Sequence, residues 1–344
     1  MNHTYKCTPR QVRKFILDCL YAGLVPFVQS SPGMGKSSIV RSIAEEGSLL
    51  MIDHRLSTSE PTDMTGLPHF NQYGFAEFAP FAGLFPVEGM ELPAGKNGWL
   101  VFLDEFNAAP RTVQAAAYKL VLDRMVGQHR LHKNVALVAA GNLATDHSIV
   151  NPISTAMQSR MIHLEMEINF NEWLEDVALK QNYDQRVIAF LMQYNEKLMD
   201  FRPDHHEKTF CCPRTWEFVN RLIKNQDIND DTAILLTGAI TSGVAMEFVQ
   251  FSKIYKDLVS IRDIQKDPKG CKLPTETALK WAVITHMMEK VDVKNFKDLS
   301  TYASRFDLSF RILFYRSILI RQPDLRTHPE FGPAVASIIH YLHE

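Results

Sequence analysis

The first half of the chain alternates between short apolar runs and longer amphipathic stretches. Four apolar runs have the length and composition of buried strands, namely Leu24 to Gln29, Leu49 to Ile52, Trp99 to Leu103 and Val135 to Ala140. The stretches with helical periodicity are Thr8 to Ala22, Lys36 to Glu46 and Arg111 to Leu122. This alternation predicts an α/β fold in which helices flank a parallel sheet.

After Phe170 the strand pattern ends and the apolar positions recur at helical spacing. The predicted helices are Asn171 to Lys180, Asp184 to Met199, Arg214 to Lys224, Asp230 to Tyr255, Thr275 to Val291, Ser309 to Ile320 and Phe331 to Leu342. The hydrophilic stretch Ile261 to Leu273 has the composition of a linker. We therefore predict an α/β core over residues 1–168, an all-helical lid over 169–228 and a helical C-terminal extension over 229–344.

Composition narrows the class of protein. Hydrophobic residues at 46% and charged residues at 22% are ordinary for a globular chain, and the net charge of −2 gives no overall field that would attract nucleic acid. Five scattered cysteines without paired spacing indicate reduced thiols. No apolar run reaches the roughly 18 residues that span a bilayer, and the N-terminus lacks the apolar core of a signal peptide. We expect a cytoplasmic protein with no membrane contact.

The strongest local motif follows the first predicted strand and opens a helix: Ser30-Ser31-Pro32-Gly33-Met34-Gly35-Lys36-Ser37. A loop of this kind turns successive backbone N–H groups toward an anion, and the helix N-terminus adds partial positive charge. It predicts that Lys36 meets the β and γ phosphates of a nucleotide and that the Ser37 hydroxyl binds Mg²⁺. The residues predicted to hold the nucleotide are Ser31, Pro32, Gly33, Met34, Gly35, Lys36, Ser37, Ser38 and Asp104.

One position departs from the usual pattern of this loop, because Ser30 stands where the first glycine is expected. Serine is compatible with the phosphate-binding conformation of the loop only if this position does not require a positive φ angle. The alternative interpretation is a glycine-rich turn that binds nothing.

Two carboxylates end the third predicted strand. Asp104 and Glu105 follow the apolar run from Trp99, at the end of a parallel strand where ligands bind. We predict that Asp104 holds Mg²⁺ and that Glu105 polarises the attacking water as general base. Taken alone, the pair is equally compatible with a helix cap.

A single amide ends the fourth predicted strand. Asn142 follows a buried run and would lie beside Asp104 and Glu105 if the two strands are neighbours. In that position it would help to position the attacking water. Without the other motifs, an ordinary turn residue is the better interpretation.

Together these motifs resemble the AAA+ ATPases of the MoxR type over roughly Val12 to Arg221. The further residues that carry the resemblance are Leu56-Ser57, Glu60 to Pro68, Phe85-Pro86, Asp104-Glu105-Phe106-Asn107, Ala109-Pro110, Asp123-Arg124, Val126-Gly127 and Ala139-Ala140-Gly141-Asn142. The resemblance implies an ATP-binding fold with a P-loop core and helical lid, acting as a homo-oligomeric ring, usually a hexamer, with ATP and Mg²⁺ between subunits.

The same resemblance assigns two arginines. Arg160, after Ser159, looks like the arginine finger that reaches the ATP of the adjacent subunit and stabilises charge in the transition state. Arg214, in Pro213-Arg214-Thr215, looks like the second sensor, which contacts the phosphates from the lid of its own subunit. For either residue alone, a surface ion pair would be the better interpretation.

Two segments resemble insertions of this family. Asp63 to Glu88 contains Tyr73, Phe75, Phe78, Phe81 and Phe85, and Met125 to Val135 has the pattern of a hairpin. The aromatic residues either grip a client or pack on the domain, and the sequence favours neither.

The resemblance implies chaperone-like work on a protein client, often one with a von Willebrand A domain. Two other hypotheses stay open at this stage. One is a nucleotide-gated assembly module that turns over rarely, against which Glu105, Asn142 and Arg160 argue. The other is a motor that acts on DNA or RNA, supported by the basic residues Arg124, His129, Arg130, His132 and Lys133 but not by the net charge.

Overall fold

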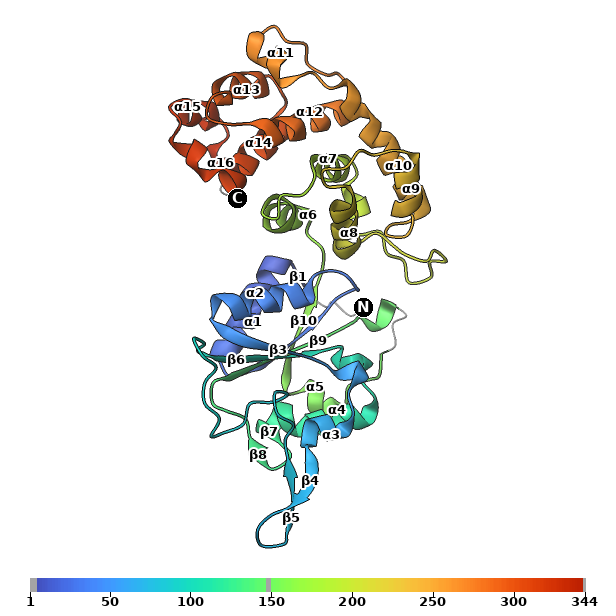
Figure 1. Ribbon diagram of the computed structural model, residues 1–344, viewed down its shortest axis with the longest axis vertical. Helices are drawn as coiled ribbons and strands as arrows, with labels where there is room; N and C mark the ends of the chain where they lie inside the picture. Colours follow the sequence, from blue (N-terminus) through green and yellow to red (C-terminus); the bar gives the residue numbers. More distant parts are fainter. Residues whose placement is uncertain (1–4, 147–149, 343–344) are drawn as a thin grey trace. The chain divides into compact units, whose positions relative to one another are not determined.

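The computed structural model describes residues 5–146 and 150–342, and the chain divides into two compact units (Figure 1). Unit 1 comprises Met1–Asn169 and Arg202–Asp204, and unit 2 comprises Phe170–Phe201 and His205–Glu344. The sequence predicts a further boundary at residue 228, which falls inside unit 2 and stays a prediction.

Unit 1 is built on a six-stranded sheet in which all neighbouring strands are parallel. In spatial order the strands are β1 (Lys6–Cys7), β10 (Met161–Met166), β2 (Val25–Gln29), β9 (Val135–Gly141), β6 (Gly98–Asp104) and β3 (Leu49–Arg55). The predicted α/β class, a parallel sheet flanked by helices and followed by a helical region, is confirmed. The order places β2, with the phosphate loop after it, next to β9, and β9 next to β6.

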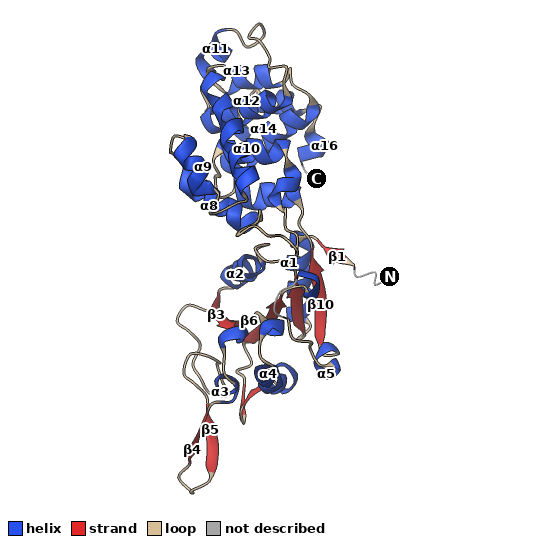
Figure 2. Cartoon of the chain, turned by 90° about the vertical axis from the view of Figure 1, so that its right-hand side faces the viewer, coloured by secondary structure: helices blue, strands red, loops and turns tan. Residues whose placement is uncertain are grey.

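Helices cover both faces of this sheet, as Figure 2 shows. One face carries α1 (Pro9–Tyr21) and α2 (Lys36–Glu46), and the other carries α3 (Pro61–Thr65), α4 (Arg111–Asp123) and α5 (Thr155–Gln158). The start of α1 is fixed by a capping box, in which Thr8 and Gln11 each accept the backbone N–H of the other. On α4, the apolar side chains of Val113, Ala117 and Leu120 are buried in the main hydrophobic cluster of the unit.

The pattern of apolar residues did not predict β10 or β1. In β10 only Met161, Leu164 and Met166 are buried, and Ile162 is 40% exposed. The reason is position, since β10 is covered on its outer side only by the two residues of β1. A strand near a sheet edge needs no continuous apolar run, so β10 lacks the signal that marks the buried strands β2, β9 and β6.

Two antiparallel hairpins extend from unit 1. The first pairs β4 (Leu67–Phe70) with β5 (Ala76–Ala79), and the second pairs β7 (Met125–Val126) with β8 (His129–Arg130), where the sequence predicts a hairpin. The turn of the second hairpin meets the base of the first. His129 Nε2 lies 2.7 Å from the carbonyl oxygen of Phe78, and Gly127 leaves no room for a Cβ against the carbonyl of Thr65.

Unit 2 is helical throughout its described residues, apart from turns and one isolated β-bridge. Its α-helices are α6 (Phe170–Trp173), α7 (Gln185–Gln193), α8 (Pro213–Ile223), α9 (Asp230–Leu236), α10 (Ser242–Lys253), α11 (Ile261–Lys266), α12 (Thr277–Lys290), α13 (Phe296–Ala303), α14 (Leu308–Arg321), α15 (Phe331–Val335) and α16 (Ile339–Leu342). A π-helical segment, Leu174–Leu179, continues α6. Helix α12 packs against both α7 and α14, so the predicted lid and extension share one core.

Two predictions for unit 2 were wrong in detail. The helix predicted over Asp230 to Tyr255 is two helices, because α9 ends at Leu236 and Thr241 begins a new helix as its N-cap. The predicted linker Ile261 to Leu273 contains α11, whose start is capped by the hydroxyl of Ser260.

Among the described residues, we find no helix with the length and apolar character needed to cross a membrane.

Candidate functional site

The phosphate loop lies between β2 and α2, at the carboxyl end of the central strands. Gly33 and Gly35 have φ angles of +77° and +91°, which only glycine adopts readily. Ser30 is buried and is not among the described residues with positive φ. Serine at this position therefore leaves the loop conformation unchanged, which meets the condition set by the sequence.

Lys36 is the first residue of α2, and its side chain folds back over the loop. Its Nζ atom lies 3.0 Å from both the carbonyl oxygen and the Oγ of Ser30, and 3.4 Å from the carbonyl oxygen of Ser31. It also lies 3.3 Å from Oδ1 of Asn142. The ammonium group thus connects the loop to the end of β9.

Ser37 and Asp104 come together beside this lysine. The Ser37 hydroxyl donates to Oδ2 of Asp104 at 3.4 Å, and Oδ1 of Asp104 accepts the backbone N–H of Glu105 at 2.9 Å. Burial raises the pKa of the Asp104 carboxyl, although the hydrogen bond from Glu105 and the charge of Lys36 act in the opposite direction. A hydroxyl and a carboxylate at this spacing are hard oxygen ligands, so the pair fits a Mg²⁺ ion.

Glu105 follows β6 in a left-handed conformation, with φ +54° and ψ +35°. Its carboxylate accepts a hydrogen bond from the Ser57 hydroxyl and lies 3.6 Å from Nε of Arg55. Arg55 is the last residue of β3 and pairs in register with Asp104, and Ser57 lies in the 3-10 turn Leu56–Thr58 that follows the strand. The carboxylate is 36% exposed, so it is held by two donors and still reached by water.

Asn142 follows β9 directly and is fixed through its main chain. The Asn107 side chain accepts the N–H of Asn142 at 3.1 Å and donates to its carbonyl oxygen at 2.8 Å. Asn107 belongs to the 3-10 turn Phe106–Ala108 that follows Glu105. Because β9 and β6 are neighbours, the expected juxtaposition of their ends is present.

The two arginines assigned by resemblance lie in different units. Arg160 is exposed just before β10, and its guanidinium donates to the carbonyl of Ala156 and to the Ser159 hydroxyl, both at 3.1 Å. Arg214 is exposed in the first turn of α8. Both assignments stay predictions.

The aromatic residues of the first insertion separate into two groups. Phe85 is buried at 2% exposure, with its ring 5.3 Å from that of His54. In contrast, Phe70, Tyr73 and Phe75 on the β4–β5 hairpin are more than 70% exposed. The register places Phe70, Ala76, Pro68 and Phe78 on one face of the hairpin, which is apolar and solvent-facing.

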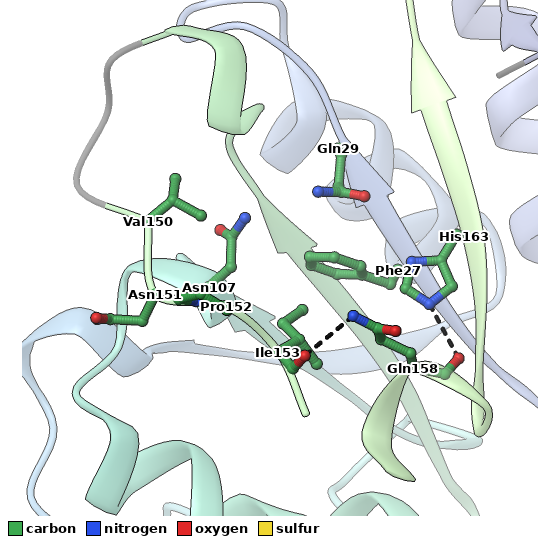
Figure 3. A pocket seen from close by; sticks show the side chains of 9 residues that line it. All are labelled: Phe27, Gln29, Asn107, Val150, Asn151, Pro152, Ile153, Gln158 and His163. Carbon is green, nitrogen blue, oxygen red and sulfur yellow. Dashed lines mark hydrogen bonds between the residues drawn. The ribbon is translucent and has the colours of Figure 1, made fainter. Parts of the chain in front are cut away.

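A cavity of about 410 Å³ lies beside the site, next to the phosphate loop through Gln29 (Figure 3). Its lining is Phe27, Gln29, Asn107, Val150, Asn151, Pro152, Ile153, Gln158 and His163. Asn151 is tied to the turn after Glu105, since its N–H donates to the carbonyl of Asn107 at 2.6 Å and its Nδ2 donates to that of Ala109 at 2.9 Å. The lining includes Asn107 but none of the predicted catalytic residues and none of the phosphate loop.

Three residues of the site were not assigned a role from the sequence: Arg55, Ser57 and Asn107. Arg55 and Ser57 were missed because the apolar run of β3 ends at Ile52, whereas the strand continues to Arg55. Ser57 and Asn107 enter the sequence prediction only as members of the motifs that carry the family resemblance, with no role of their own. The signal that could have found Asn107 is the glycine at position 141, which is needed where another group approaches the backbone closely.

No family model matches the chain, and no curated protein matches it. Among solved structures it is similar to a candidate ATPase from Cytophaga hutchinsonii, with 15% identity over 88% of this chain and 78% of that one, at a TM-score of 0.36. It is also similar to the RuvB Holliday junction branch migration motor of Thermotoga maritima, with 15% identity over 85% of this chain and 87% of that one, at a TM-score of 0.37. Both TM-scores are low, so the likeness supports no inference about function.

Proposed function

We propose that this protein is an ATP-hydrolysing ring ATPase of the AAA+ kind, similar to the MoxR group, that couples hydrolysis to remodelling or activating a protein partner. One observation carries the proposal. The Lys36 ammonium, the Ser37–Asp104 pair, the Glu105 carboxylate and the Asn142 amide all lie at the carboxyl ends of β2, β6 and β9. In parallel sheets this edge is where ligands bind.

Each group has a role that suits its chemistry. The backbone N–H groups of residues 31–38, apart from Pro32, and the Lys36 ammonium would bind the phosphates, and the N-terminus of α2 adds partial positive charge. A Mg²⁺ ion held through Ser37 and Asp104 would neutralise charge on the β and γ phosphates. Glu105 would accept a proton from the attacking water, and Asn142 would orient that water.

The ring and the client rest on the family resemblance together with two surface features. Arg160 is exposed and bonded only locally in the described contacts, as suits a residue that serves a neighbouring subunit. Arg214 would contact the phosphates of the nucleotide from the helical lid of its own subunit. The exposed aromatic face of the β4–β5 hairpin suits contact with a protein client, of which a von Willebrand A domain is one candidate.

The basic residues that suggested a nucleic-acid motor are largely occupied within unit 1. The Arg124 guanidinium donates to the carbonyl of Val135, His129 bonds the carbonyl of Phe78, and His132 packs its ring on Trp99. Of the five, Arg130 and Lys133 are left exposed. Two cations make a weak electrostatic footprint for nucleic acid, so we favour the protein client.

Phosphate release by the wild type, Lys36→Ala and Glu105→Gln tests the proposal. We expect Mg²⁺-dependent ATP hydrolysis by the wild type, no nucleotide binding by Lys36→Ala, and ATP binding without turnover by Glu105→Gln. Light scattering of Glu105→Gln with ATP and Mg²⁺ should show a hexamer-sized species. Tight ATP binding by Lys36→Ala would contradict the site, and wild-type binding without turnover would favour the nucleotide-gated module.

A further inference from the structure

Asn107 is a buried amide that the proposed chemistry does not use directly. It is 2% exposed and lies two positions after Glu105. Its side chain makes both hydrogen bonds to the main chain of Asn142, one as acceptor and one as donor. Only one orientation of the amide satisfies both, because the N–H requires an oxygen and the carbonyl requires an NH₂ group.

The Asn107 side chain continues the hydrogen-bond pattern of the sheet by one residue beyond the end of β9. Strand β9 ends at Gly141, and beyond it the Asn107 amide takes the place that a neighbouring peptide group would occupy beside Asn142. The pairing is close. A Cβ on Gly141 would overlap Oδ1 of Asn107 and would lie 3.0 Å from Cζ of Phe27.

The consequence lies in the side chain of Asn142. Its Oδ1 faces Nζ of Lys36 at 3.3 Å, at the edge where the proposed water would attack. A residue just past a strand end has few other restraints on its backbone. The Asn107 amide supplies two, and it does so from the same turn that carries Glu105.

We propose that Asn107 is a positioning residue for hydrolysis, which fixes the Asn142 side chain relative to Glu105 and Lys36. This inference rests on the proposed ATPase function. If Asn107 acts through Asn142, its loss should lower kcat more than it lowers nucleotide affinity. A side chain of the same shape that can still donate a hydrogen bond should restore kcat.

The test is Asn107→Asp, which preserves shape but replaces the NH₂ donor with a carboxylate that repels the carbonyl of Asn142. At pH 8 we expect kcat to fall by about 10- to 100-fold, the range that misplaced catalytic groups produce, with ATP affinity within about 3-fold of the wild type. As the pH falls, the buried carboxyl protonates and can donate again, so the ratio of variant to wild-type kcat should rise.

A matched control comes from the same cavity. Asn151→Asp makes the same chemical change at an amide that bonds Ala109 rather than Asn142, and its kcat should stay within about 3-fold of the wild type. Measured over the same pH range, this control also supplies the reference pH profile. Gly141→Ala should reproduce the loss, because the added methyl displaces Asn107.

Two results would overturn the inference while the wild type hydrolyses ATP. One is a kcat for Asn107→Asp within about 2-fold of the wild type at pH 8. The other is an equal further loss when Asn107→Asp is added to Asn142→Ala, since effects that pass through one residue are not additive. Hydrogen exchange tests the two hydrogen bonds between the Asn107 side chain and the Asn142 main chain independently of ATP hydrolysis. The backbone N–H of Asn142 should exchange at least about 10-fold faster in Asn107→Ala, and unchanged exchange would show that Asn107 does not restrain Asn142. A wild type that does not hydrolyse ATP would instead remove the proposed function.

Discussion

Arg55 and Glu105 face each other across two neighbouring parallel strands, with Nε of Arg55 3.6 Å from Oε1 of Glu105. The Ser57 hydroxyl donates to the other oxygen of the same carboxylate. The proposed general base is therefore restrained by β3 as well as by its own strand, β6.

Removing the Ser57 hydroxyl should release one oxygen of Glu105. We expect Ser57→Ala to lower kcat for ATP hydrolysis by about 10-fold, because a loosely held base samples fewer productive geometries, and to leave ATP affinity unchanged. Steady-state phosphate release and titration with a fluorescent ATP analogue measure the two quantities. Ser42→Ala removes a hydroxyl that bonds the carbonyl of Ile39 within α2, and it should have no effect on kcat. Equal kcat in both variants would mean that Ser57 does not restrain the base.

The buried Asp104 carboxyl should make the nucleotide-free protein less stable at neutral pH. Because burial raises its pKa in the folded protein, the ionised form costs stability above that pKa, and the cost disappears below the ordinary pKa of about 3.9. We expect Asp104→Asn to raise the melting temperature at pH 7, with a difference that shrinks as the pH falls toward 4. Thermal melts across this range without nucleotide check the prediction. A difference that grows on acidification would contradict the sign.

Exposed and buried aromatics of the first insertion should differ in their contribution to folding. Phe85→Ala should lower the free energy of unfolding of unit 1 by about 3 to 5 kcal/mol, because the buried ring leaves a cavity. The double change Tyr73→Ser and Phe75→Ser should alter it by less than about 0.5 kcal/mol per residue, and should leave basal ATP hydrolysis intact. Hydrogen exchange of peptides from β6 in denaturant measures the free energy of unfolding of both variants. A large loss in the double variant would show that these side chains pack on the domain.

In unit 2 the pair Arg186–Asp184 should be a strong structural contact. The guanidinium makes two hydrogen bonds to the Asp184 carboxylate, both at 2.8 Å, and donates to the carbonyls of Ile223 and Gln226. Since both side chains are largely buried, Arg186→Ala should cost about 3 to 5 kcal/mol of unfolding free energy.

The control for that variant is Arg221→Ala. It breaks a pair with Glu217 on the surface of α8, which should cost less than about 1 kcal/mol. Denaturant unfolding followed by far-ultraviolet circular dichroism compares the two variants. Similar midpoints would mean that Arg186 contributes no more than a surface charge.

A mixed-ring experiment tests Arg160. Arg160→Ala should be inactive alone, but an equal mixture with Glu105→Gln should regain part of the wild-type turnover. Some interfaces then combine an intact Glu105 with an intact Arg160 from the neighbouring subunit. Turnover of the mixture that equals the mean of the two pure variants would weigh against a role in trans.

The sequence predicts those parts of the fold and site that are local in the chain. The phosphate loop is one continuous segment, so its strand, glycines and lysine are recognisable together, and the structure has the loop between a strand and a helix as expected. Strands β2, β9 and β6 are buried almost throughout and have continuous apolar runs, and the edge strand β3 begins with the apolar run Leu49 to Ile52. The division of the helical half into lid and extension is different, because it depends on how α7 packs on α12, far away in the chain.

Long-range pairing explains most of what the sequence did not predict. Strand β10 is recognisable only once β1 and β2 flank it. Arg55 and Ser57 acquire a role only because β3 pairs with β6 in the register that sets Arg55 beside Asp104. Asn107 looks like a surface turn residue until β9 is placed next to β6. The spatial partners of these residues lie far from them in the sequence, so the local sequence does not indicate the contact.

Helix α4 connects the turn after Glu105 with the β7–β8 hairpin. It begins at Arg111, shortly after the turn that carries Glu105 and Asn107, and ends at Asp123, where the β7–β8 hairpin follows. Thirteen helical residues form a rod about 20 Å long. Since such a rod resists bending, a tilt of the turn would be passed to the β7–β8 hairpin at its far end, and from there through His129 to Phe78 of the β4–β5 hairpin, as mechanical displacement rather than as a change in chemistry.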